Sequence, residues 1–252
     1  MKIFIVESEN DEFFVRALIT EMQQTAAKVY AIEEFKHSNL SETALKTQIS
    51  SALIDLRSIN GAMLGIVLDI DEAAQQDRLD LVNRCIQKAF YENFERDIDT
   101  ILSQTNQLYP LRIDEYTTVQ VACHFTNVDG KGELETVLKS IKTQDSTFAD
   151  CLECWQKCFE QRNKKLAAKG EQGDITDKEM LKLWVDFYKR FDTMKKSKRN
   201  EFSTDWKGIW LGETAPNKRG ETRQVEARGT TIFDLNHTVL NDLKNFIRLF
   251  EQ

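Results

Sequence analysis

Residues 62–71 are Ala-Met-Leu-Gly-Ile-Val-Leu-Asp-Ile-Asp, a nearly continuous apolar run that ends in two carboxylates. An apolar strand without polar alternation is typical of the centre of a parallel sheet, where helices cover both faces. We therefore expect a buried strand here, with Asp69 and Asp71 at its carboxyl end. Because residues i and i+2 of an extended segment point to the same side, the two carboxylates can face one point.

Strand-like and helix-like patterns alternate around this run as far as residue 141. The expected strands are residues 3–6, 29–32, 62–68 and 117–125, and the expected helices cover residues 11–22, 41–59, 79–90 and 133–141. Such alternation predicts an α/β fold with a mostly parallel sheet flanked by helices. The later helical patterns are residues 149–168, 176–195 and 238–250, around an irregular polar segment at 197–233. We expect an α/β domain over 1–141 and a helical and irregular C-terminal part over 142–252 packed on it.

The composition is that of a helix-rich globular chain. Of 252 residues, 30% are charged and only 2 are Pro and 10 Gly, which excludes collagen-like and low-complexity disordered classes. The net charge of −7 hides an asymmetry, since residues 1–150 hold 14 basic and 25 acidic side chains, whereas residues 151–252 hold 20 and 16. An acidic front half and a basic back half indicate different roles for the two parts.

The sequence also bears on membrane association and on the cellular compartment. No run of about 18 apolar residues occurs, so we expect no membrane-spanning helix and no membrane partner. The first residues, MKIFIVESEN, suit a strand better than the apolar core of a secretory signal. Five Cys, an odd number, indicate reduced thiols, and we expect a cytoplasmic protein.

A third acid, Glu7, ends the first expected strand, just as Asp69 and Asp71 end the central one. In open α/β sheets, function gathers outside the carboxyl ends of the strands. Three close carboxylates repel one another unless a cation neutralises them. Mg²⁺ is held by carboxylates together with waters and substrate phosphates, which suits phosphodiester transfer.

Three segments together resemble the Toprim domain of topoisomerases, primases and small nucleases, including stand-alone nucleases and those of the OLD (overcoming lysogenization defect) type. The first, IFIVESENDEFFVRALI, delivers Glu7 from a strand and Asp11 four positions later. The second, GIVLDIDE, contains the Asp-x-Asp pair, and the third, DGKGELETVLKSI, is similar to the Gly-x-Leu-Glu segment of the nuclease-like families. The tail FDLNHTVLNDLKNFIRLF is similar to C-terminal segments of stand-alone Toprim proteins. The chain differs from the usual pattern at Ser8, where Toprim domains have Gly.

The resemblance implies a Mg²⁺- or Mn²⁺-dependent nuclease, or a related phosphodiester-transfer enzyme, acting on DNA or RNA. The metal ligands that it implies are Glu7, Asp11, Asp69, Asp71, Asp129 and Glu135. The catalytic residues that it implies are Glu7, Asp69, Asp71 and a Lys, for which Lys198 and Lys207 are both candidates. Glu7 could serve as the general acid or base instead of as a ligand.

A basic segment with interleaved aromatic residues, 187–228, could hold the nucleic acid, because it carries 11 Lys and Arg against 6 Asp and Glu. A basic groove with stacking side chains binds single strands without sequence preference. The side chains that we expect to contact phosphates are Lys195, Lys196, Lys198, Arg199, Lys218, Arg219 and Arg223. The plainer alternative is a solvated charged face.

Two other functions stay open. The first strand is also similar to that of response-regulator receivers, but the Met-Pro-like turn and the Lys-Pro that receivers carry are missing. The second alternative is a non-catalytic Toprim-like binding or regulatory module in a partner or defence complex, with a protein partner or a homo-oligomer. No GxxxxGK[ST] loop occurs, so the chain brings no ATPase of that kind.

The remaining Cys and His residues have structural interpretations. We expect Cys151, Cys154 and Cys158, together with Trp155 and Phe159, to form one buried helical stripe without a metal. His124 lies on an expected strand, and His237 precedes the last expected helix as a capping residue.

Overall fold

The structure is a computed structural model that describes residues 1–24, 27–32, 41–170, 175–201, 205–212, 220–221 and 224–251. The chain divides into two compact units. Unit 1 consists of Met1–Leu134 and Leu235–Gln252, and unit 2 of Glu135–Asp234. Residues 235–252, which we expected in the C-terminal part, belong instead to the unit that holds the sheet.

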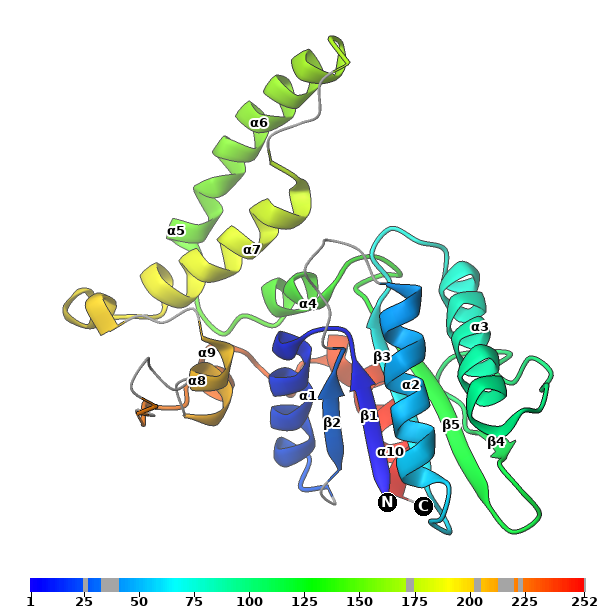
Figure 1. The fold of residues 1–252 in the computed structure, drawn as a ribbon. Helices are drawn as coiled ribbons and strands as arrows, with labels where there is room; N and C mark the ends of the chain where they lie inside the picture. Colours follow the sequence, from blue (N-terminus) through cyan, green and yellow to red (C-terminus); the bar gives the residue numbers. More distant parts are fainter. Residues whose placement is uncertain are drawn as a thin grey trace. The chain divides into compact units, whose positions relative to one another are not determined.

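Unit 1 contains a five-stranded sheet with the order β2-β1-β3-β5-β4 (Figure 1). Its strands are β1 (Lys2–Val6), β2 (Lys28–Ala31), β3 (Met63–Asp69), β4 (Tyr109–Arg112) and β5 (Thr118–Thr126). The first three and β5 run parallel, and β4 pairs antiparallel with β5 at the edge. The α/β class with a mostly parallel sheet is therefore confirmed. The strand β4, which has only four residues and contains Pro110, was not expected from the sequence.

The strand order reverses direction between β1 and β3. From β1 the chain moves outward to β2, and from β3 it moves to the other side of the sheet, first to the edge strand β4 and then to β5. In doubly wound sheets this switch point opens a crevice at the carboxyl ends of the strands, where ligands bind. Glu7 follows β1 and Asp69 ends β3, so the two acids lie on either side of the switch point.

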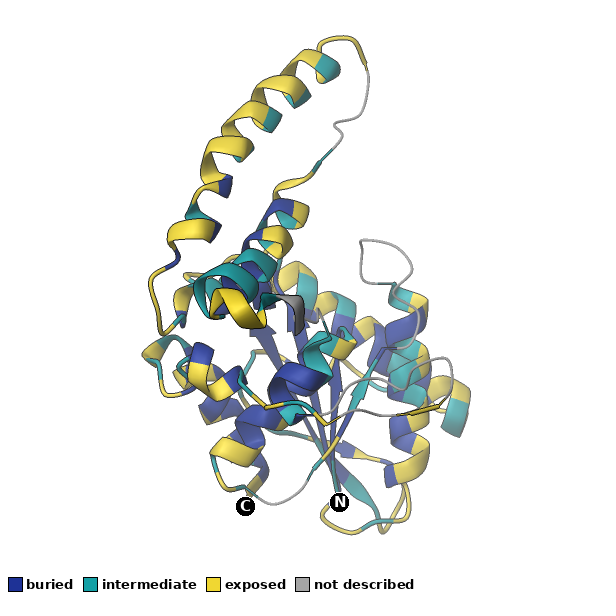
Figure 2. Ribbon diagram, turned by 90° about the vertical axis from the view of Figure 1, so that its left-hand side faces the viewer, coloured by how far each residue is buried: buried dark blue, intermediate teal, exposed yellow. Residues whose placement is uncertain are grey.

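Helices cover both faces of the sheet. Those of unit 1 are α1 (Glu9–Glu21), α2 (Glu42–Leu56), α3 (Gln75–Phe94) and α10 (Asn241–Arg248), the last flanked by the 3-10 turns η3 (Thr238–Leu240) and η4 (Leu249–Glu251). Alternate residues of β1 and β3, such as Ile5 and Ile66, pack with α2 and α3 in one apolar cluster. All seven residues of β3 are buried, and much of the sheet is dark blue in Figure 2.

Aromatic residues of the C-terminal segment pack on the opposite face of the sheet. The ring of Phe250 lies 4.6 Å from that of Phe4, centroid to centroid, and Phe246 lies 5.5 Å from the ring of His124 on β5. Gly65 of β3 faces the same cluster, and a Cβ at this position would overlap the ring of Phe4. This close approach explains why the otherwise bulky central strand contains a glycine.

Unit 2 consists of helices of different lengths and turns. They are α4 (Leu134–Ser140, which begins at the unit boundary), α5 (Thr147–Asp150), α6 (Leu152–Ala167), α7 (Asp177–Phe187), the π-helical turn η1 (Tyr188–Asp192), the 3-10 turn η2 (Lys196–Glu201), α8 (Trp206–Leu211) and α9 (Gly229–Ile232). The buried Tyr188 hydroxyl links distant segments, because it donates to the Ile232 carbonyl at 2.9 Å and accepts from the Thr143 and Gln144 amides at 3.1 Å. Its ring stacks on Trp184.

The prediction of a buried cysteine stripe on α6 is wrong. Cys151, Cys154 and Cys158 are exposed, and Trp155 is 58% exposed. The helix turns a different face toward α7, since Leu152 is its buried residue and Gln156 hydrogen-bonds Asp177. The three cysteines and Trp155 therefore face solvent, and most of α6 is yellow in Figure 2. Among the helices that the structure describes, none has the length and apolar character to cross a membrane.

Candidate metal centre

Three carboxylates converge beside the carboxyl end of β3. Asp69, Asp71 and Glu133 each present an oxygen, and these oxygens all lie within 4.8 Å of one another. Asp69 and Glu133 are buried, whereas Asp71 is partly exposed. We call these three residues the acid cluster. They belong to unit 1, and the third member comes from the segment that connects β5 to α4.

Asp69 is held from two sides. Its Oδ1 accepts a hydrogen bond of 3.1 Å from the backbone N–H of Leu134, the first residue of α4. Its own backbone N–H donates to Glu7 Oε2, also at 3.1 Å. Glu7 is 5% exposed, so the position directly after β1 brings a fourth acid, itself buried, next to the cluster. These two bonds join the ends of β1 and β3 to the start of α4.

Asp71 departs from the extended conformation expected from the sequence. It has φ +52°, a left-handed conformation that Asp tolerates better than most side chains. Its backbone N–H and C=O exchange two hydrogen bonds of 2.9 Å with Gly132. Its carboxylate also forms an ion pair with Arg78, in the first turns of α3. Asp71 therefore reaches the cluster because the segment around Gly132 and the helix α3 both hold it.

A tight turn explains which acids of the segment 129–135 reach the cluster. Val128 and Lys131 pair across the turn, and Asp129 and Gly130 at its tip have φ +54° and +82°. These signs at both central positions are those of a type I′ turn, for which Asp-Gly is a preferred sequence. Asp129 is consequently exposed at the tip and is not part of the cluster.

Glu133 takes the place that the resemblance implied for Glu135. Because Gly132 pairs with Asp71, the next residue lies beside the Asp-x-Asp pair. Glu135 is also buried, but it belongs to unit 2, where its charge acts on Lys189. In the sequence, Glu133 is marked only by its position directly after Gly132. That position indicates a place in the acid cluster only once Gly132 is known to pair with Asp71.

Asp11 and Ser8 have a local role at the start of α1. The Ser8 side chain accepts from the Asp11 N–H at 3.4 Å, and Asp11 Oδ2 accepts from the Ser8 N–H at 2.9 Å, which forms a capping box. Ser8 has φ −134°, which needs no glycine. Ser8, at the position where Toprim domains have Gly, is therefore compatible with the turn from β1 into α1.

The chemistry of the acid cluster fits a hard divalent cation. All three ligand atoms are carboxylate oxygens, the donors that Mg²⁺ and Mn²⁺ prefer. Two of the three carboxylates are buried, and close buried negative charges repel one another when no cation neutralises them. The cluster thus offers the charge, the donor type and the spacing for a metal ion.

The sequence model of the family described as "Protein of unknown function (DUF3226)" matches residues 1–251. The chain belongs to the DUF3226 family. The match spans both units, and therefore includes the acid cluster and the helices of unit 2 alike. No curated protein and no solved structure matches this DUF3226 chain.

The basic residues that we expected to contact phosphates belong to unit 2 of this DUF3226 chain. They form three groups. Lys195, Lys196 and Lys198 are exposed at and next to η2. Arg199 is held within the unit, because it donates to the Phe191 carbonyl at 2.8 Å and its guanidinium lies over the rings of Phe148 and Phe191. The third group, Lys218, Arg219 and Arg223, lies outside the described residues. Lys207, the alternative catalytic Lys, is partly buried in α8.

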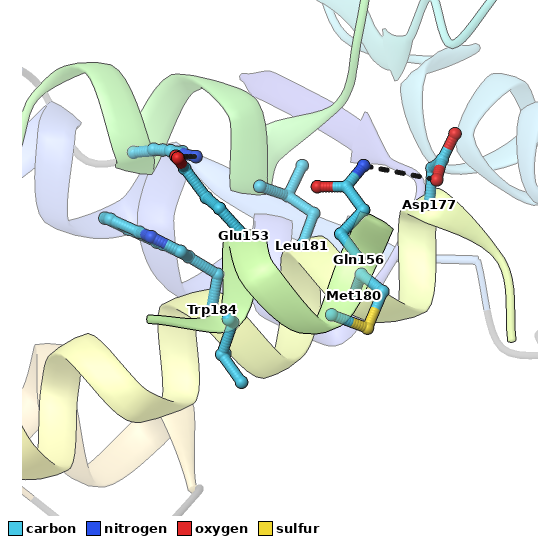
Figure 3. Close-up of a pocket in the computed structure, with 8 residues that line it drawn as sticks. Glu153, Gln156, Asp177, Met180, Leu181 and Trp184 are labelled. Atoms are coloured by element: carbon cyan, nitrogen blue, oxygen red, sulfur yellow. Dashed lines mark hydrogen bonds and ion pairs between the residues drawn. The ribbon is translucent and has the colours of Figure 1, made fainter. Parts of the chain in front are cut away.

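Unit 2 of this DUF3226 chain also contains a pocket of about 240 Å³ between α4, α6 and α7 (Figure 3). Leu152, Met180, Leu181 and Trp184 provide apolar walls. The polar lining residues largely contact one another, since Lys139 pairs with Glu153 at 3.6 Å and Gln156 bonds Asp177 at 3.3 Å. The pocket is consequently a small amphipathic hollow without a convergent set of charges of one sign.

The two described histidines are structural, as expected. His124 is buried on β5 with its Nδ1 2.9 Å from Asn106 Oδ1, and burial lowers its pKa to about 4. His237 caps η3, because its Nδ1 accepts from the Val239 N–H at 3.2 Å. His37 lies outside the described residues.

Proposed function

We propose that the protein is a metal-dependent phosphodiester-transfer enzyme, a Toprim-type nuclease that acts on DNA or RNA with Mg²⁺ or Mn²⁺. The observation that carries the proposal is the convergence of Asp69, Asp71 and Glu133 next to Glu7, at the switch point of a doubly wound sheet. Sites of this kind bind ligands in many α/β proteins. The order of the acids along the chain supports the resemblance to Toprim domains.

Each acid has a role in this proposal. The acid cluster would hold the divalent cation, which supplies an activated water and neutralises charge on the phosphate. Glu7 is buried and adjacent to Asp69, so it is suited to take a proton from the attacking water or to return one to the leaving oxygen. The resemblance to Toprim nucleases also implies a lysine that supports the charge developing on the phosphate, and Lys198 and Lys207 are its candidates in the sequence.

The nucleic-acid partner is proposed from the charge of unit 2. The exposed Lys195, Lys196 and Lys198 form a short basic face, and basic surfaces attract the phosphate backbone without regard to sequence. A cytoplasmic location with reduced thiols belongs to the same proposal. It is supported by three exposed cysteines, which are free in the structure.

A second candidate is a non-catalytic binding or regulatory module. The observation that favours it is the ion pair between Arg78 and Asp71, in which a side chain of the protein supplies a cationic partner to one member of the acid cluster. A module of this kind would bind nucleic acid or a protein partner and would cleave neither DNA nor RNA.

A cleavage assay separates the two candidates. Supercoiled plasmid, single-stranded DNA and RNA are incubated with the protein in Mg²⁺, in Mn²⁺ and in EDTA. We expect cleavage of at least one substrate with metal, none with EDTA, and background rates for Asp71→Asn, since Asn also tolerates the left-handed conformation. Asp129→Asn, at the exposed turn tip, is the matched control and should cleave as wild type does. An active Asp71→Asn would contradict the site, and a metal-binding wild type that cleaves nothing would favour the module.

A further inference from the structure

We propose that Arg78 is the phosphate-contacting residue of the acid cluster: it pairs with Asp71 while the cluster holds no cation and turns to the substrate phosphate when a cation binds. This inference rests on the proposed function and deepens it. It makes cation binding and phosphate binding mutually dependent, with one guanidinium as the link.

The position of Arg78 fits this role. It lies one turn into α3, where its backbone N–H bonds the Ala74 carbonyl, so a long helix fixes its Cα close to the acids. Its guanidinium Nη2 contacts Asp71 Oδ2. Only 13% of the Arg78 side chain is exposed, against 31% of Asp71. The contact is thus partly shielded from water and stronger than an exposed surface pair.

The hydrogen bonding of Arg78 leaves capacity for a further partner. Its Nε is buried and makes no hydrogen bond within the described part of the chain. A buried donor that makes no hydrogen bond costs stability, and an acceptor that reaches the guanidinium would recover that cost. A guanidinium presents its donors in a planar fork that matches two oxygens of a phosphate. The partner that this geometry suits best is therefore a phosphate group beside the acid cluster.

Charge balance explains why the two binding events should depend on each other. A divalent cation at Asp71 competes with Arg78 for the same carboxylate, so in the absence of a phosphate the guanidinium opposes the cation. A phosphate gives the displaced guanidinium a new anionic partner and removes that opposition. Phosphate and cation should then raise each other's affinity by the same factor.

The test measures Mn²⁺ affinity by titration calorimetry, with and without a single-stranded phosphorothioate oligonucleotide that resists cleavage. The variants are Arg78→Met, Arg78→Lys and the control Arg84→Met. Arg84 is on the same helix and pairs with Glu42 at 3.6 Å, away from the acid cluster. Circular dichroism and melting curves verify folding, and Arg78→Lys keeps the positive charge if Arg78→Met fails to fold.

For wild type and Arg84→Met, the oligonucleotide should tighten Mn²⁺ binding. Without oligonucleotide, Arg78→Met should bind Mn²⁺ about ten-fold more tightly than wild type, the effect of one removed unit charge in a water-like dielectric. The oligonucleotide should then add nothing. Arg78→Lys should keep the weak Mn²⁺ affinity but lose most of the oligonucleotide effect, because it lacks the planar fork.

Three results would overturn the inference, and each contradicts a different part of it. Arg78→Met with wild-type Mn²⁺ affinity, or with the oligonucleotide effect intact, would show that Arg78 only supports the fold. If the oligonucleotide tightened Mn²⁺ binding by Arg78→Lys as much as by wild type, the planar guanidinium would not be needed for the effect. A wild type that binds no Mn²⁺ at all would remove the proposed function itself, and this inference with it.

Discussion

The Glu7 carboxylate accepts a hydrogen bond of 3.1 Å from the backbone N–H of Asp69, although the two residues are 62 positions apart in the sequence. This bond connects the ends of β1 and β3, the two neighbouring parallel strands between which the strand order reverses. Both residues are buried, at 5% and 6% exposure. Glu7 is therefore fixed next to the acid cluster by its bond to the backbone of β3.

Substituting Glu7 separates its two proposed roles. Glu7→Gln keeps an oxygen that can accept from the Asp69 N–H, so the fold should remain intact. If Glu7 moves a proton, cleavage should fall by about 10²- to 10⁴-fold, while Mn²⁺ affinity stays near that of wild type. Initial rates and calorimetric titration check the two effects. A large decrease in Mn²⁺ affinity would make Glu7 a ligand instead.

The stability of the protein should depend on the protonation of His124. Burial lowers its pKa to about 4 in the folded state, below about 6.5 in the unfolded chain. The unfolded state therefore binds more protons between these values, so this contribution is fully present above pH 6.5 and is lost as the pH falls toward 4. The decrease should amount to roughly 2–3 kcal/mol. Urea unfolding at pH 7 and pH 4.5 should show a smaller drop for His124→Gln than for wild type, and equal drops would contradict the assignment.

The five thiols should divide into two classes of reactivity. Cys151, Cys154 and Cys158 are exposed on or next to α6 and should react quickly with a thiol reagent at pH 8. Cys85 and Cys123 are buried, and burial raises their pKa values to about 11 and about 12, so they should react only after unfolding. Counting released chromophore before and after guanidinium addition checks this. If fewer than three thiols reacted quickly, the result would support the buried cysteine stripe that the sequence predicted.

The basic face next to η2 should determine the salt dependence of nucleic-acid binding. Reversing the charge of Lys195, Lys196 and Lys198 together should flatten the plot of log affinity against log salt by about 0.7–0.9 for each phosphate that the variant no longer neutralises. These side chains are exposed, so the variant should fold as wild type does. Anisotropy titrations of labelled single-stranded DNA between low and moderate salt measure the slope. An unchanged slope would mean that this face is only solvated.

Much of the sheet was predictable because its strands carry strong local patterns. The apolar run before Asp69 marked the central strand, and the β-branched run before His124 marked β5. The strand β4 was missed because an antiparallel edge strand of four residues with a proline carries little periodicity. The direction of α6 was missed for another reason, since a helix with polar residues on several sides does not disclose which face meets its neighbour.

The acid cluster was predictable in part. Strand ends indicate Asp69 and Asp71, because parallel strands deliver their carboxyl ends to one edge. The choice between Glu133 and Glu135 depends on the pairing of Gly132 with Asp71, a contact between distant segments that no local pattern encodes. Arg78 was missed likewise, because an arginine in the first turns of an amphipathic helix is ordinarily a solvated residue.

The most direct test of the central claim compares Glu133→Gln with Glu135→Gln in a calorimetric titration with Mn²⁺. Both residues are buried, and they are two positions apart, but only Glu133 belongs to the acid cluster. We predict that wild type and Glu135→Gln bind Mn²⁺ and melt at a higher temperature in its presence, because the ion binds only the folded state. Glu133→Gln should show neither effect. Equal binding by the two variants, or an absence of binding in Glu135→Gln alone, would contradict the assignment of Asp69, Asp71 and Glu133 as the metal centre.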